Sequence, residues 1–166
     1  LLFAQQPFVL GCRARVAFGD DDPAERHVLV LGGDMIGGNI HAELVETNDL
    51  GIPRAVRELG EDIAGGILTL VRRVGCRVRV YSVPGNHGRD TAKPQSKRRA
   101  AHSLDLLVAD FAEAALRGAG VAADQVAFYA TRSPDAYFST YGFNWLVTHG
   151  DAMGVGGGKG YIGPIA

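Results

Sequence analysis

The sequence predicts an α/β fold, a layered sandwich in which helices flank a mixed β-sheet. Two observations carry this prediction: short apolar runs that end at glycine, as in residues 27–31, and longer segments with apolar residues at helical spacing, as in residues 53–74. They follow one another as strand, helix, strand, helix and further strands, which is typical of a sheet covered by helices. With 166 residues and 46% apolar side chains, the chain has the size of one domain, residues 1–166.

The first strands are expected near the amino terminus. Residues 8–10 and 13–18 are rich in β-forming residues and are expected to form two strands joined at Gly11-Cys12. Residues 27–31 are mostly apolar and are followed directly by Gly32-Gly33. Such a run predicts a buried strand of a parallel or mixed sheet.

Two helices are expected between the strands. The first covers residues 53–74, with Pro53 in its first turn and Gly75 as its carboxyl-terminal cap. A Gly65-Gly66 pair inside it indicates a bend or a close approach to the sheet. The second helix is expected to begin at Ser96 and to end at Gly118 and Gly120.

The remaining strands are predicted from alternation and from turn residues. Residues 76–83 alternate between polar and apolar side chains, and Pro84-Gly85 ends the run. Residues 126–131, 136–141 and 143–148 have the same character and are separated by turn-forming residues.

Charge and cysteine content narrow the classes of partner. The chain has 17 basic and 18 acidic side chains and a net charge of −1, so contact with nucleic acid needs a local basic patch. Its two cysteines, Cys12 and Cys76, cannot build a secreted disulfide framework, which favours a reduced, cytoplasmic setting. No apolar run approaches the roughly 20 residues that span a bilayer, so no membrane partner is expected.

Three of the predicted strands end in polar residues that can bind metal. Asp34 follows Gly32-Gly33, Asn86-His87 follows Pro84-Gly85, and His149 follows residues 143–148. Ligands of α/β sheets bind beyond the carboxyl ends of the strands, so these side chains are expected in one crevice. Carboxylate, amide and imidazole donors suit Mn²⁺, Fe or Zn²⁺. Each residue by itself also fits a structural role, a turn or cap for Asp34 and Asn86 or a hydrogen-bonded His149, and only their conjunction favours a metal site.

These motifs resemble those of the calcineurin-like metallophosphoesterase superfamily, in particular its phage and prophage members. The resemblance covers about residues 28–150, through Gly33-Asp34, Gly85-Asn86-His87 and His149-Gly150. It implies a dinuclear site with two divalent ions, Mn²⁺ first and Fe, Zn or Ni as alternatives. Asp34 would bridge the ions, Asn86 and His149 would bind one of them, and His87 would be the general acid or transition-state stabiliser.

The chain departs from the family pattern at both ends. It contains no Asp-x-His motif, which supplies first-metal ligands in the family, and no Gly-His-x-His motif before Ala166. We therefore expect either a domain that is incomplete at one or both ends or a degenerate relative. The leading interpretation is a phosphomonoesterase or phosphodiesterase; the alternatives are a non-catalytic binding or scaffold module and a nucleic-acid-processing nuclease subunit.

Candidate substrate contacts lie close to these motifs. Asn39 and His41 are expected either to face a phosphate ester or to belong to a polar loop that caps the next segment. Arg89 is the preferred phosphate contact, and it begins a run of five basic residues against one acid that ends at Arg99. This run binds substrate phosphates or a nucleic-acid backbone, or it is a solvated loop. Glycine-rich residues 154–163 are expected to form a loop beside the site, with Lys159 as a further phosphate contact.

Overall fold

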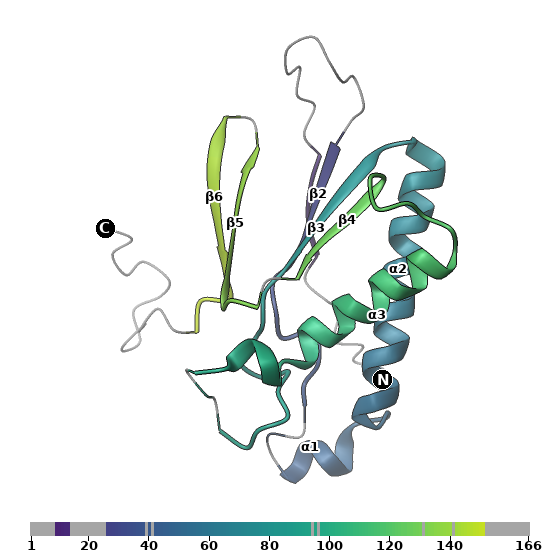
Figure 1. The fold of residues 1–166 in the computed structure, drawn as a ribbon. Helices are drawn as coiled ribbons and strands as arrows, with labels where there is room; N and C mark the ends of the chain where they lie inside the picture. The colour runs from purple at the N-terminus through teal and green to yellow at the C-terminus, as the bar shows by residue number, and fades with distance from the viewer. Residues whose placement is uncertain are drawn as a thin grey trace.

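The computed structural model describes residues 9–13, 26–38, 40, 42–93, 95, 97–130, 132–140 and 142–151. They form three layers: a helical layer, a four-stranded sheet and a two-stranded hairpin (Figure 1). The elements, in chain order, are β1 (Val9–Arg13), β2 (Arg26–Leu31), α1 (Ala42–Thr47), α2 (Ile52–Val74), β3 (Arg77–Ser82), the 3₁₀ turn η1 (Arg99–His102), α3 (Leu104–Gly118), β4 (Val126–Ala130), β5 (Asp135–Thr140) and β6 (Phe143–Thr148).

The larger sheet is mixed, as the sequence predicts. Its strands lie in the order β1-β2-β3-β4; β2, β3 and β4 run parallel, and β1 is antiparallel to β2. Leu31 pairs with Ser82 across β2 and β3, so these two strands end at the same level. The loops that follow them therefore begin side by side.

The helices α2 and α3 cover one face of this sheet. Val78 and Val80 of β3 are fully buried against a cluster that includes Ile67 of α2 and Leu116 of α3. Their alternation along β3 is the one that the sequence shows, because every second side chain of a strand points to the same face. Burial of this apolar surface supplies the main driving force for the layer contact.

The hairpin of β5 and β6 lies against the opposite face. Tyr81 of β3 stacks on Phe138 of β5, with ring centroids 4.4 Å apart, and on Tyr129 of β4 at 4.8 Å. Val83 and Ala136 are buried in the same cluster. This contact lies at the carboxyl end of β3, and it brings the end of β6, where His149 follows, towards the loops after β2 and β3 (Figure 1).

Three sequence expectations need correction. Strand β1 runs straight through Gly11 and Cys12, so the predicted junction of two strands at that point is wrong, and residues 14–18 lie outside the described part. The second long helix begins at Leu104 and not at Ser96, because the Ser103 hydroxyl caps it by accepting a hydrogen bond from the Leu106 amide at 3.2 Å. The short helix α1 was not predicted.

The third expectation to be corrected is the close approach to the sheet at Gly65-Gly66 of α2. A Cβ at Gly65 or Gly66 would meet nothing within 4 Å, so this pair makes no close approach to the sheet. The close approach is instead at Gly60, where a Cβ would lie 2.7 Å from Phe111 Cβ and 3.0 Å from the Val108 carbonyl oxygen. Gly60 thus sets the distance between α2 and α3.

Replacing Gly60 with alanine is expected to lower the free energy of unfolding by about 1–3 kcal/mol, because the added methyl group overpacks the helix interface. The matched variant Gly66→Ala adds the same methyl group to the same helix in open space. It is expected to raise stability by roughly 0.5–1 kcal/mol through helix propensity. Urea unfolding measures both, and equal effects of the two substitutions would contradict the assigned packing.

In the part of the chain that the structure describes, no helix combines the length and the apolar character required to cross a membrane.

Candidate functional site

The loops after β2, β3 and β6 bring three predicted metal ligands together. His149 Nε2 lies 3.0 Å from Asp34 Oδ2 and 3.0 Å from Asn86 Oδ1. Two donor atoms about 2.1 Å from a common ion lie roughly 3.0–3.4 Å from each other at ordinary coordination angles. Both distances from Nε2 therefore lie in the range of two ligands of one ion.

The His149 ring is oriented by its second nitrogen. Nδ1 lies 2.8 Å from the Gly32 carbonyl oxygen, and because a carbonyl only accepts, Nδ1 donates this hydrogen bond. Such a bond from one ring nitrogen to a backbone carbonyl is the usual support of a metal-binding histidine. It leaves Nε2, the atom that faces Asp34 and Asn86, as the ring nitrogen that could bind an ion.

Asp105, in the first turn of α3, holds the loops of Asp34 and Asn86 together. Its side chain is fully buried, and its carboxylate accepts hydrogen bonds from the amides of Met35 at 2.8 Å, Gly85 at 2.8 Å, Asp34 at 3.2 Å and Ile36 at 3.4 Å. The amides of residues 34–36 thus form a concave nest around one anion. Sequence reasoning missed Asp105, since an acidic residue in a first helical turn is common and its burial leaves no mark on the sequence.

The backbone at Asp34 is in the left-handed region. Its φ is +52°, after +85° at Gly33, and a non-glycine residue there is strained by roughly 1–2 kcal/mol. The bonds to Asp105 offset this strain. The backbone is also closely packed at the preceding residue, because a Cβ at Gly33 would lie 2.5 Å from the Gly85 amide nitrogen. Glycine is required on this side of the loop contact.

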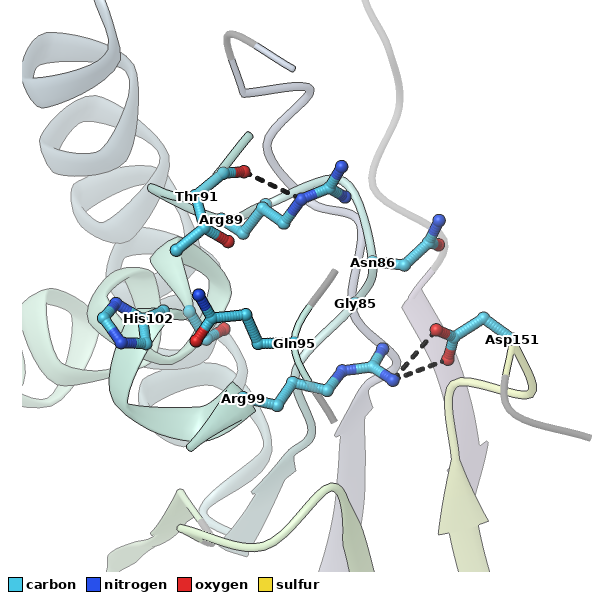
Figure 2. A pocket seen from close by; sticks show the side chains of 10 residues that line it. Gly85, Asn86, Arg89, Thr91, Gln95, Arg99, His102 and Asp151 are labelled. Atoms are coloured by element: carbon cyan, nitrogen blue, oxygen red, sulfur yellow. Dashed lines mark hydrogen bonds and ion pairs between the residues drawn. The ribbon is translucent and has the colours of Figure 1, made fainter. Parts of the chain in front are cut away.

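Arg99 of η1 joins the loops of Asn86 and His149. Its guanidinium forms an ion pair with Asp151, with Nη1 and Oδ1 2.8 Å apart, and Nη2 donates to the Pro84 carbonyl oxygen at 3.0 Å (Figure 2). Asp151 is two residues after His149, and Pro84 is two residues before Asn86. One short segment therefore joins two of the three loop pairs: Arg99 joins the loops of Asn86 and His149, and Asp105 joins those of Asp34 and Asn86.

The electrostatics follow from the contact between His149 and Asp34. The hydrogen bond with Asp34 raises the pKa of His149 to about 8, although burial opposes this. Burial raises the pKa of Asp34, but the hydrogen bonds from His149 and from the His87 amide outweigh it, so the net pKa is lowered. Burial raises the pKa of Asp105 despite its backbone hydrogen bonds. The raised pKa of His149 and the lowered pKa of Asp34 both favour an ion pair between an imidazolium and a carboxylate.

This pair predicts a pH-dependent stability of the metal-free protein. His149 has a folded pKa of about 8 against an ordinary value of 6.5, so its contribution is complete below pH 6.5 and is lost as the pH rises through about 8. The contribution is roughly 2 kcal/mol at most.

Urea unfolding in EDTA at pH 6 and pH 9 tests this expectation. The difference in unfolding free energy between the wild type and His149→Gln should be larger at pH 6. A difference that does not change with pH would exclude the protonated pair.

The other predicted site residues are distributed as follows. The His87 amide donates to Asp34 Oδ1 at 2.7 Å, and its side chain is exposed beside the cluster. Arg89 lines a pocket of about 240 Å³ that Asn86 also lines (Figure 2), and its Nε donates to the Thr91 carbonyl oxygen at 2.9 Å. Asn39, His41, Lys159 and the glycine-rich residues 154–163 lie outside the described residues.

The described donors form a set large enough for one divalent ion. The Asp34 oxygen Oδ1 already accepts the His87 amide, which leaves Oδ2 to face an ion. Across the described ranges there is no group of three or more His, Cys, Asp and Glu side chains that could hold a metal, and the cluster here has two such residues plus Asn86. Asp34, Asn86 and His149 can therefore hold one divalent ion through two oxygens and one nitrogen.

Comparison with known proteins finds no relative: no family model, no curated protein and no solved structure matches the chain. The resemblance to metallophosphoesterases consequently depends on the sequence motifs alone.

Proposed function

We propose that this chain is a metal-dependent phosphoesterase domain that acts on phosphate monoesters or diesters. The observation that supports the proposal most is the meeting of Asp34, Asn86 and His149 at the strand ends, with Nε2 of His149 facing the two oxygens at 3.0 Å. Phosphoester hydrolysis needs strong charge stabilisation at the phosphoryl oxygens, and a divalent ion supplies it as a Lewis acid.

The residues of the chain have separate tasks in this proposal. Asp34, Asn86 and His149 hold the ion. His87 has an exposed imidazole on the same loop as Asn86, and its backbone is fixed by the hydrogen bond to Asp34. An imidazole can protonate the departing oxygen near neutral pH, which is the role we assign to His87. Arg89 lies in the adjacent pocket and can bind a phosphate oxygen.

Hydrolysis of p-nitrophenyl phosphate and of bis-p-nitrophenyl phosphate, in EDTA and in excess Mn²⁺, tests the proposal and the ester class. We expect Mn²⁺-dependent turnover that His87→Gln lowers by about 10²–10⁴-fold while Mn²⁺ affinity changes little, because the His87 side chain is not a ligand. Asn86→Ala should instead weaken Mn²⁺ binding. Absence of Mn²⁺-dependent turnover with either ester would overturn the proposal.

A second candidate is a metal-binding module without catalysis. It is favoured by the donor set, because the described residues supply three donors, of which Asp34 presents Oδ2 while Oδ1 accepts the His87 amide, enough for a single ion. This candidate predicts Mn²⁺ binding that Asn86→Ala weakens, with no ester hydrolysis at all. The two readouts of the previous experiment therefore separate the two functions.

A further inference from the structure

A basic surface adjoins the metal cluster. Between Arg89 and Arg99 the described residues Lys93, Lys97 and Arg98 are exposed, and within the described ranges no carboxylate lies within ion-pair distance of them. Three acids on this face lie against other groups: Asp90 is 2.8 Å from His102, Asp151 is 2.8 Å from Arg99, and Asp110 interacts with the charge of Arg132. The surface thus keeps the positive charges of Lys93, Lys97 and Arg98 without a paired carboxylate among the described residues.

Two hollows on this surface share Arg99. The first, about 240 Å³, is the pocket lined by Asn86, Arg89 and Arg99 (Figure 2). The second, about 170 Å³, is lined by Arg98, Arg99 and Arg132. Figure 2 shows the Arg89 and Arg99 side chains on the hollow that Gly85 and Asn86 also line, with Arg99 joined to Asp151 and Arg89 to Thr91. Both hollows are therefore lined by guanidinium groups.

The size and chemistry of the hollows favour a chain of small anionic units. Both are smaller than the roughly 300–1,000 Å³ of pockets that hold one drug-sized ligand. The apolar residues between positions 89 and 103 are three alanines and one proline, so the segment has nothing large to insert into a lipid surface. It also has no Phe, Tyr or Trp for base stacking, and its His102 ring is held by Asp90, which leaves the phosphates as the main groups to be contacted.

We propose that the two hollows on either side of Arg99 form a track for the sugar-phosphate backbone of a polynucleotide, which leads one strand from the metal cluster over the basic loop. Arg89, Arg98 and Arg132 contact successive phosphates, and Lys93 and Lys97 add charge at the rim. The track deepens the proposed function by naming its substrate class, and it rests on that function only for the position of the scissile phosphate. Binding along the track needs no metal.

Fluorescence anisotropy of a labelled twelve-nucleotide oligo-dT, in EDTA and across a salt series, tests the track. We expect saturable binding whose affinity falls with salt by about 0.7 logarithmic units per logarithmic unit of salt for each phosphate contact. The double variant Arg98→Glu, Arg132→Glu removes two of the three phosphate contacts, so it should flatten the slope by about 1.4 and weaken binding at 50 mM salt at least tenfold.

The control makes the same charge change elsewhere. Arg72 and Arg73 are exposed in the last turn of α2, before β3 begins, whereas the track lies beyond the end of β3. Arg72→Glu with Arg73→Glu should change affinity less than twofold. Equal losses in both double variants, no saturable binding at 50 mM salt, or equally strong competition by inorganic polyphosphate of the same charge would each overturn the proposal.

Failure of the track and failure of the proposed function give different results. Oligonucleotide binding in EDTA without ester hydrolysis in Mn²⁺ supports the track and removes the phosphoesterase function. Hydrolysis of the p-nitrophenyl esters without oligonucleotide binding supports the function and overturns the track.

Discussion

Replacing Asp34 with asparagine is expected to weaken Mn²⁺ binding by at least about 100-fold and to reduce metal-dependent ester hydrolysis to background. The substitution removes the negative charge that faces His149 Nε2 at 3.0 Å. It preserves the local backbone, because asparagine tolerates the left-handed conformation of residue 34 and its side-chain oxygen can still accept the His87 amide. Isothermal titration with Mn²⁺ and the ester assay measure the two losses.

The matched control for this substitution is Asp62→Asn. Asp62 is exposed on α2, and the same change of charge there should leave Mn²⁺ affinity and hydrolysis unaltered. Circular dichroism establishes that both variants fold. Wild-type Mn²⁺ affinity in Asp34→Asn would show that this carboxylate is no ligand, and the proposed function would lose the observation that supports it most.

The meeting of Asp34, Asn86 and His149 was predictable because it depends on strand direction. Strands β2 and β3 run parallel and end in register, Leu31 opposite Ser82, so polar residues just beyond them must be neighbours. Alternation and glycine positions are enough to locate these strand ends along the chain. The loop after β6 joins them through packing of the hairpin on Tyr81, which the sequence does not show.

The supports of the site were not predictable in the same way. Asp105 binds backbone amides 20 to 71 residues away, and Arg99 binds Asp151 52 residues away. In the sequence the first is an ordinary helix-start acid and the second is one of several basic residues. The start of α3 is a related case, because serine is a suitable cap and the sequence has one at 96 and one at 103. The helix begins after Ser103, and this start places Asp105 against the loops of Asp34 and Gly85.

Asp105→Asn is expected to lower the free energy of unfolding by about 2–4 kcal/mol, because a buried polar group without a hydrogen-bond partner is strongly destabilising. The carboxylate accepts four backbone amides with its two oxygens. In an asparagine one oxygen becomes an NH₂ group, which points a donor at amides that are themselves donors. The loops of Asp34 and Gly85 then lose their common anchor, and Mn²⁺ affinity should fall by about 10–100-fold.

Loss of stability by itself would not establish that Asp105 positions the ligands, so the experiment needs a variant of similar instability. Val108 is fully buried, three residues further along α3, and packs against Ile36 and Val56 without a hydrogen bond to the ligand loops. Val108→Ala should destabilise the fold through a cavity by about 1–3 kcal/mol and leave Mn²⁺ affinity within twofold of the wild type below its unfolding transition. Mn²⁺ titration of both variants under conditions in which both are folded separates the roles. Equal losses of affinity would reduce Asp105 to general support of the fold, whereas a loss confined to Asp105→Asn follows from an anchor that holds Asp34 and Asn86 at coordination distance.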